Sequence, residues 1–197
     1  MIEQSEKYLN WQKTGMTRSS TKQLWTNEYN MFTWEETYMI DEVPLADVWD
    51  NFATTSKLEL ENLYRLKSLP KECTKHYMCF RPELSVGLSK VLAQFENKLY
   101  NYNFLKLTPG YNLLWHYDSY STFVKFNNIN QADANNINRT IIMITPWSPG
   151  QILQVGNDIA SHWNVGDTFT WNSDTWHGLS NFGFNDCVVM QVTWLPA

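Results

Sequence analysis

Cysteine is scarce in this sequence, and the three that occur, Cys73, Cys79 and Cys187, do not make a disulfide framework. A reducing, cytoplasmic location is therefore expected in preference to secretion. Residues 1–6 are polar and acidic, whereas a signal peptide would begin with a basic and then an apolar stretch. No apolar run approaches the ~20 residues of a membrane-spanning helix, so no membrane partner is expected.

Positive charge is also in short supply. Lys and Arg number 15 against 20 Asp and Glu, which gives a net charge of −5 at pH 7. Nucleic-acid-binding domains usually carry a basic stripe, so no nucleic-acid partner is expected. The chain is instead rich in hydrophobic residues (43%) and in aromatic residues (15%, with ten Trp), enough to build a packed core. At 197 residues, a single domain spanning 1–197 is the simplest organisation.

The clearest chemical pattern is the segment 109–118, which reads PGYNLLWHYD. Its Pro-Gly pair predicts a tight turn, and the apolar residues that follow predict a short strand. His116 and Asp118 are two residues apart, so in a strand both face the same side. An imidazole and a carboxylate on one side supply two ligands of a 2-His-1-carboxylate site, which holds Fe(II) with positions left open. The third ligand must come from a distant strand, and His177 is the best candidate. The alternative is a structural His–Asp hydrogen bond at a strand end.

This pattern resembles the Fe(II)/2-oxoglutarate-dependent dioxygenases, and within them the prolyl hydroxylase and aspartyl/asparaginyl hydroxylase branches. The resemblance rests on Gly-x5-His-x-Asp, on Gly166-Asp167 before a strand and on a distal His before a terminal hydrophobic strand, and it covers about residues 103–196. It implies a mainly β protein with flanking helices. A double-stranded β-helix (jelly-roll, cupin-like) core would occupy 103–197, preceded by an N-terminal arm and bracing helices in 1–102.

The same resemblance implies an activity. Fe(II), 2-oxoglutarate as cosubstrate and O2 would together hydroxylate an unactivated C–H bond. The related branches suggest a Pro, Asn or Asp side chain of a protein or peptide, although free amino acids and small metabolites fit equally well. Halogenating members of the superfamily replace the metal-binding carboxylate by a small residue, so Asp118 favours hydroxylation over halogenation.

The far carboxylate of 2-oxoglutarate needs a cation, and the sequence lacks one in the usual place. Most of the resembled families carry an Arg or Lys where this chain has Asp186 and Cys187, and no Arg or Lys follows Arg139. Arg139 is the expected replacement, because an Arg near the start of the corresponding strand contacts the cosubstrate in the aspartyl/asparaginyl hydroxylase branch. Its planar guanidinium suits a carboxylate. Lys106 and Lys125 are weaker candidates.

Two polar residues of the last predicted strand are expected to help hold the cosubstrate. Gln191 and Thr193 share one face of that strand and can both hydrogen-bond a ligand. The competing interpretation of Arg139 is an ion pair at the surface. Without an anchor, the chain would be a non-catalytic or 2-oxoglutarate-independent metal-binding jelly-roll protein, which is the alternative function. The sequence leaves the substrate and the oligomeric state open.

The remaining elements are predicted from periodicity. Helices are expected at 41–52, 58–66 and 82–99, and strands at 29–40, 104–108, 139–144, 151–155, 168–171 and 187–194. The polar segment 119–138 leaves directly from Asp118 and is expected to form a mobile lid, with a surface insertion as the alternative. Cys73-x2-His76-x2-Cys79 contains zinc-ligand types, but a fourth ligand is missing nearby, so a structural role is preferred. His162 is expected to be structural or at the surface.

Overall fold

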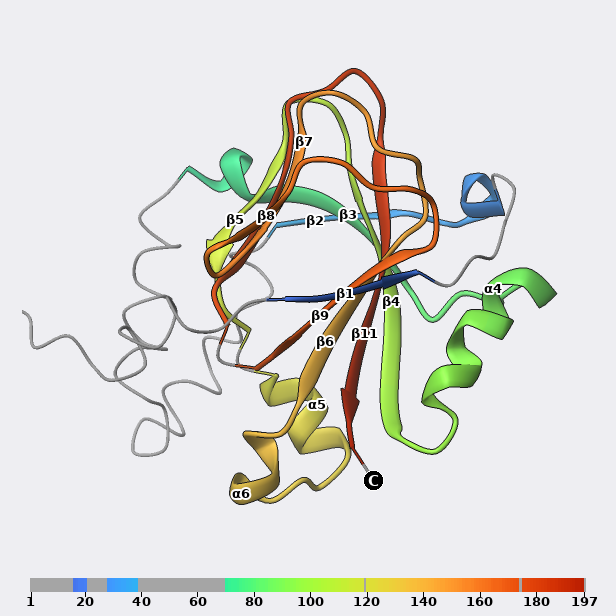
Figure 1. Ribbon diagram of the computed structural model, residues 1–197, viewed down its shortest axis with the longest axis vertical. Helices are drawn as coiled ribbons and strands as arrows, with labels where there is room; N and C mark the ends of the chain where they lie inside the picture. Colours follow the sequence, from blue (N-terminus) through green and yellow to red (C-terminus); the bar gives the residue numbers. More distant parts are fainter. Residues whose placement is uncertain (1–15, 21–27, 39–69, 119, 174, 197) are drawn as a thin grey trace, which may run out of the picture.

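Two antiparallel β-sheets lie face to face and form the body of the protein (Figure 1). The computed structural model describes residues 16–20, 28–38, 70–118, 120–173 and 175–196. The larger sheet has the strand order β1-β9-β6-β11-β4-β3-β2, and the smaller sheet has the order β5-β10-β7-β8. This is a double-stranded β-helix, so the expectation of a mainly β jelly-roll core with flanking helices is confirmed.

The strands of the larger sheet are β1 (Thr17–Ser20), β2 (Glu35–Tyr38), β3 (Lys75–Phe80), β4 (Leu99–Leu107), β6 (Asn138–Met143), β9 (Asp167–Asn172) and β11 (Cys187–Leu195). Those of the smaller sheet are β5 (Asn112–His116), β7 (Gln151–Val155), β8 (Asp158–Ala160) and β10 (His177–Asn181). The helices are η1 (Glu28–Met31), η2 (Lys71–Thr74), α4 (Val86–Leu92), η3 (Ala93–Phe95), α5 (Ser121–Phe126) and α6 (Gln131–Ala134).

Apolar side chains fill the space between the sheets. Alternate residues of the larger sheet, such as Leu105 and Val189, meet Leu153 and Leu179 of the smaller sheet in one buried cluster. The intervening residues of the same strands point outward. There Phe104 and its neighbours pack under α4 in a second cluster. The central strands are therefore buried on both faces, which explains the apolar stretches 141–143 of β6 and 187–190 of β11.

Five predicted strands are present, with small differences at their ends. The strand expected at 104–108 is longer, because β4 pairs with β11 along its full length from Leu99 to Leu107. The strand expected at 29–40 is only partly correct, since η1 precedes the short strand β2. β1, β2 and β3 extend the larger sheet on both sides of the jelly roll. The helices expected at 41–52 and 58–66 lie outside the described residues.

The helix expected at 82–99 is shorter than predicted. It begins at Val86, because the Ser85 hydroxyl caps it by accepting a hydrogen bond from the Leu88 amide at 3.2 Å. It ends in η3 at Phe95. Leu99, assigned to the helical stripe from its spacing, instead starts β4 and pairs with Leu195. Strand pairing with a distant segment therefore overrides a local helical pattern.

The segment 119–138 is not a structureless loop over its described residues 120–138. It contains α5 and α6, and the Asn130 side chain caps α6 by accepting from the Asp133 amide at 2.9 Å. Phe123 and Ile137 are buried together with Tyr120 and pack against Leu195. Tertiary packing stabilises helices this short, and the segment carries too few apolar residues for periodicity to reveal them.

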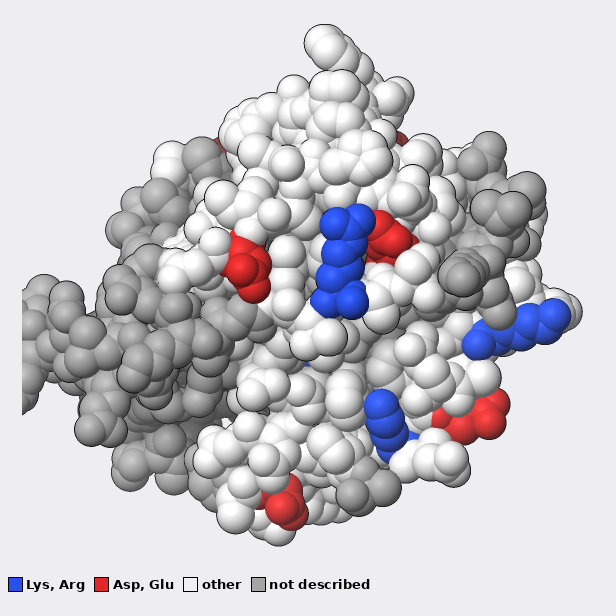
Figure 2. All heavy atoms as spheres, in the orientation of Figure 1, with Lys and Arg blue, Asp and Glu red and all other residues white. Residues whose placement is uncertain are grey.

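The zinc interpretation of the Cys-His-Cys spacing finds no support. Within β3, Cys79 lies in the outer cluster, while His76 has the same parity as Met78, which faces the inner core. The side chain of Cys73 is outside the described residues. In the part of the chain that the structure describes, no helix is long and apolar enough to cross a membrane. On the face shown in Figure 2, charged side chains lie singly or in mixed groups, without a continuous field of one sign.

Candidate metal centre

His116, Asp118 and His177 come together at one end of the smaller sheet. β5 and β10 are antiparallel neighbours, and His116 is the direct register partner of His177. The pairing slips between His177 and Leu179. Gly178 lies at the slip, where an added Cβ would be only 3.1 Å from the Leu113 carbonyl oxygen. A glycine here therefore lets the two strands approach closely enough to bring the imidazoles together.

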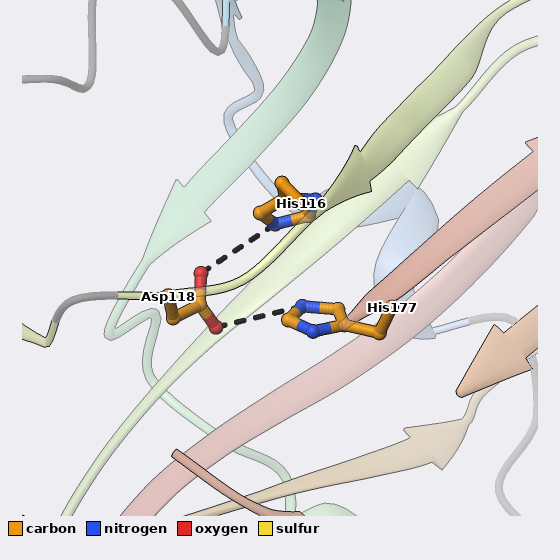
Figure 3. A group of neighbouring side chains, drawn as sticks. All are labelled: His116, Asp118 and His177. Carbon is orange, nitrogen blue, oxygen red and sulfur yellow. Dashed lines mark ion pairs between the residues drawn. The ribbon is translucent and has the colours of Figure 1, made fainter. Parts of the chain in front are cut away.

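The three side chains converge, as Figure 3 shows. Their candidate ligand atoms all lie within 4.8 Å of one another. Asp118 Oδ1 is 3.5 Å from His116 Nε2, and Asp118 Oδ2 is 3.6 Å from His177 Nε2. The two imidazole centroids are 4.3 Å apart. Two nitrogens and a carboxylate around one point are the ligand set and the spacing that a divalent transition metal requires.

Backbone carbonyls orient both imidazoles. His116 Nδ1 lies 2.5 Å from the Leu114 oxygen, and His177 Nδ1 lies 2.9 Å from the Thr175 oxygen. A carbonyl can only accept, so each Nδ1 carries the proton. Each Nε2 then presents its lone pair toward Asp118. This is the outer-shell arrangement that fixes the tautomer of metal-binding histidines.

Electrostatics keep the site in its ligating protonation state. Burial alone would raise the pKa of Asp118, but the opposing effects, of which the Arg139 guanidinium is the largest, hold that pKa well below its ordinary value. Burial and the neighbouring His116 lower the pKa of His177 to about 3. Asp118 is therefore anionic and His177 neutral at physiological pH, as metal ligands must be.

Arg139 joins the same site from β6. Its Nη2 and Nε donate to Asp118 Oδ2 at 2.9 and 3.2 Å. The side chain is only 12% exposed, so this is a largely buried ion pair and the surface interpretation is wrong. Burial would lower the pKa of Arg139, but Asp118 reverses that effect and raises it. The weaker candidates lie elsewhere: Lys106 sits over the rings of Trp34 and Tyr77 on the outer face, and Lys125 is exposed on α5.

Gln191 and Thr193 lie on the inner face of β11, at the level of the metal ligands. Thr193 is the register partner of Arg139, and Gln191 is one step further into the barrel. The Gln191 side-chain oxygen accepts from Asn103 Nδ2 at 2.9 Å. No hydrogen bond joins either residue to the three candidate ligands within the described structure. His162 is exposed beside Trp147, away from the site.

Two residues at the site escaped prediction. Tyr120 is buried over the Arg139 guanidinium, 5.1 Å from ring centroid to Cζ. Trp171 is the register partner of Arg139, and its ring lies 4.8 Å from that of His177. The Tyr120 hydroxyl and the Trp171 Nε1 are buried without a hydrogen-bond partner in the described part of the chain. Strand alternation could have indicated that the Trp171 side chain points into the barrel. The sequence contains no comparable pattern that would place Tyr120 at the site.

Tyr120 also has an unusual backbone and a perturbed hydroxyl. Its φ is +52°, in the left-handed region that non-glycine residues seldom occupy. Burial, followed by the charge of Asp118, raises its pKa well above the ordinary value, while Arg139 acts in the opposite direction. The hydroxyl therefore lies near both charged groups without the geometry of a hydrogen bond to either. Strain of this kind often marks functional sites.

No protein-family model matches the sequence, and no curated protein matches it with significant similarity. Solved structures align with the chain at low identity and with TM-scores below 0.5. A Pseudomonas putida prolyl-4-hydroxylase aligns with 87% of this chain and 96% of its own, at 13% identity and a TM-score of 0.45. A predicted oxalate decarboxylase from Thermotoga maritima aligns with 61% and 81%, at 15% identity and 0.39. A cupin domain from Bordetella pertussis aligns with 62% and 94%, at 11% identity and 0.36. The sheet topology itself identifies the chain as a double-stranded β-helix protein, and it carries a candidate His-Asp-His metal site.

Proposed function

We propose that this protein is an Fe(II)- and 2-oxoglutarate-dependent dioxygenase that hydroxylates an unactivated C–H bond. The observation that carries the proposal is the convergence of His116, Asp118 and His177 within 4.8 Å, with both Nε2 lone pairs facing the carboxylate. The three residues lie at or just beyond the ends of two adjacent strands, β5 and β10. A 2-His-1-carboxylate set of this kind would leave coordination positions for a chelating ligand and O2.

The site also suits a ligand with two negative charges. The charges of Asp118 and Arg139 cancel, so a divalent ion leaves two positive charges, which the 2-oxoglutarate dianion would balance. The buried Tyr120 hydroxyl and Trp171 Nε1 are donors without partners beside Arg139. An unpaired buried polar group costs about 1–3 kcal/mol of stability. A ligand rich in hydrogen-bond acceptors would pair with these two donors and remove that cost. These observations support Arg139 as the carboxylate anchor.

Bound Fe(II) would supply the oxidation, in which 2-oxoglutarate becomes succinate and CO2, one oxygen atom enters succinate and the other enters the substrate. The chain itself positions the reactants. His116, His177 and Asp118 would hold the ion, and the remaining guanidinium N–H groups of Arg139 would face the far carboxylate of 2-oxoglutarate. Trp171 lies against His177 and limits the access of water to that ligand. The substrate would be a Pro, Asn or Asp side chain of a peptide, a free amino acid or a small metabolite.

A 2-oxoglutarate-independent metal-binding jelly-roll protein is the second candidate, and a specific observation favours it. Where most of the resembled families place their cation, this chain has Cys187, which is fully buried in the apolar core. Burial raises the pKa of its thiol to about 12, so the group stays neutral. Arg139, in turn, is already engaged by Asp118.

Anaerobic reconstitution with one equivalent of Fe(II) separates the two candidates. Addition of 2-oxoglutarate should produce a weak visible charge-transfer band, and admission of O2 should then produce succinate. Fe(II) binding without a band or succinate would establish the second candidate. Failure to bind Fe(II) would overturn both.

A further inference from the structure

The inner face of the larger sheet changes from apolar to polar at the level of the metal ligands. Deeper in the barrel, one cross-strand row contains Met143, Val189, Leu105 and Met78, all of them in the core. The next row contains Ile141, Gln191, Asn103 and Phe80, and the row after that contains Arg139, Thr193 and Asn101. Asn and Gln are seldom placed inside a barrel without a partner for their amides. We call Asn101, Asn103, Gln191 and Thr193 the polar strip.

The polar strip uses only part of its hydrogen-bonding capacity. Asn103 Nδ2 donates to Gln191 Oε1 at 2.9 Å, which leaves the Gln191 amide hydrogens for another partner. Asn101 Oδ1 accepts from Arg81 Nε at 2.6 Å, which leaves the Asn101 amide hydrogens. Asn101 and Asn103 are half-buried, so a ligand can reach them. A row of side-chain amides offers both donors and acceptors, which is what a peptide backbone requires.

Arg81 extends the strip to the mouth of the barrel. It follows β3 directly and adopts φ +45°, a left-handed conformation that is strained for an L-residue. In a continued strand its side chain would point to the outer face, opposite to Phe80. The left-handed turn instead brings it to Asn101 on the inner face. The bond through Nε leaves the two terminal amino groups of an exposed guanidinium, which suit a carboxylate.

Phe80 adds an apolar element at the same place. It is the register partner of Asn103 and has the parity of Met78, so it faces inward, yet it is 62% exposed. An exposed aromatic ring beside half-buried amides provides a surface for an aliphatic or flat group of a ligand. Adjacent strands are about 4.8 Å apart, so Asn101 lies about 10 Å from Arg139, across β11. That distance corresponds to about three residues of extended chain.

We propose that Arg81, Asn101 and Asn103 form the substrate site, and that it takes a peptide whose carboxylate pairs with Arg81 about three residues from the residue that reacts. The proposal rests on the proposed function, because the metal centre defines the reacting end. The carboxylate is either the C-terminus or an acidic side chain. The neutral strip holds the intervening backbone, and Phe80 contacts a side chain near the anchor.

Binding can be measured without turnover on protein loaded with Zn(II) and 2-oxoglutarate. The probes are N-acetyl-trialanine with a free C-terminus, its C-terminal amide, and N-acetyl-Ala-Ala-Glu-amide. Their binding is measured by ligand-detected NMR. The wild type should bind one or both acids about 10- to 100-fold more tightly than the amide, which corresponds to one charge-assisted hydrogen-bonded contact. The acid that binds more tightly identifies the source of the carboxylate.

Variants locate the contact. Arg81→Met should abolish the preference for acid, and Asn103→Leu should weaken all three peptides together. Lys90→Met removes an exposed cation on α4 and should change nothing. Equal binding of acid and amide, a preference that survives in Arg81→Met, or no saturable binding of any peptide would overturn the proposal. Arg81→Met and Asn103→Leu should keep wild-type affinity for Fe(II) and 2-oxoglutarate. If the wild type lacks that affinity, the proposed function fails instead.

Discussion

Replacing Arg139 with Met tests the most unusual feature of the site, the ion pair between a candidate metal ligand and the proposed cosubstrate anchor. The change keeps an unbranched apolar stem of similar length. It removes two hydrogen bonds to Asp118 Oδ2, at 2.9 and 3.2 Å, and the positive charge that balances a carboxylate only 22% exposed. Removing one partner of a buried ion pair typically costs 3–5 kcal/mol. Because Asp118 keeps some exposure, we expect about 3 kcal/mol for the metal-free protein.

The metal-loaded protein should respond differently. A bound divalent ion gives Asp118 a new counter-charge, so the same substitution should cost only about 1 kcal/mol of unfolding free energy. Folding and metal binding form a thermodynamic cycle, so the difference of about 2 kcal/mol between the two forms must appear in the free energy of metal binding. The variant should therefore bind metal roughly 30-fold more tightly than the wild type. Its affinity for 2-oxoglutarate should instead fall about 10- to 100-fold, since the distal carboxylate loses a charge-assisted partner.

The assay is urea unfolding of the wild type and the variant, each metal-free and with Zn(II), together with titration of 2-oxoglutarate into the Fe(II) protein. Arg18→Met is the matched control, because Arg18 is half-exposed and pairs with Asp167 far from the metal. It should cost the same in both forms, because Asp167 is not a candidate metal ligand, and leave both affinities unchanged. Equal destabilisation of Arg139→Met with and without metal would refute the shared role of Asp118. Unchanged 2-oxoglutarate affinity would place the anchor elsewhere.

Three further predictions address the ligands, the segment beside them and the pH response. His177→Ala should abolish stoichiometric Fe(II) uptake, measured by anaerobic titration, and undiminished uptake would remove His177 from the ligand set. Hydrogen exchange over residues 120–137 should slow when metal and 2-oxoglutarate are added, because Tyr120 and Phe123 anchor α5 beside Arg139; identical exchange would make this segment an ordinary surface insertion. For the metal-free protein, the depressed pKa of His177 (about 3, against 6.5 in the unfolded chain) means that only the unfolded state binds a proton between these values. Stability should therefore be full above pH 6.5 and fall by up to about 1.4 kcal/mol per unit as pH drops toward 4, and His177→Gln should lack that slope in denaturation curves.

The sequence alone was sufficient where the determining interactions are local. The Pro-Gly turn, with Gly110 at φ +89°, and the strand that carries His116 follow from short-range backbone preferences. Alternation predicted His116 and Asp118 on one side, although β5 ends at His116 and Asp118 lies two residues beyond it. The buried strands β6 and β11 were predictable because burial on both faces favours the apolar stretches 141–143 and 187–190 within them. A strand's period is a property of its own residues, so these predictions needed no partner.

Tertiary structure decided which residues from different strands meet. The register of β10 against β5 sets His177 opposite His116, and the register of β6 against β9 and β11 gives Arg139 its neighbours Trp171 and Thr193. No local pattern encodes these pairings, because cross-strand register depends on the packing of the whole sheet. The same non-local pairing took Leu99 out of the predicted helix and into β4. The Asp118–Arg139 ion pair and the buried Tyr120 hydroxyl exist only because the folded barrel brings these side chains together in a place that excludes most of the water.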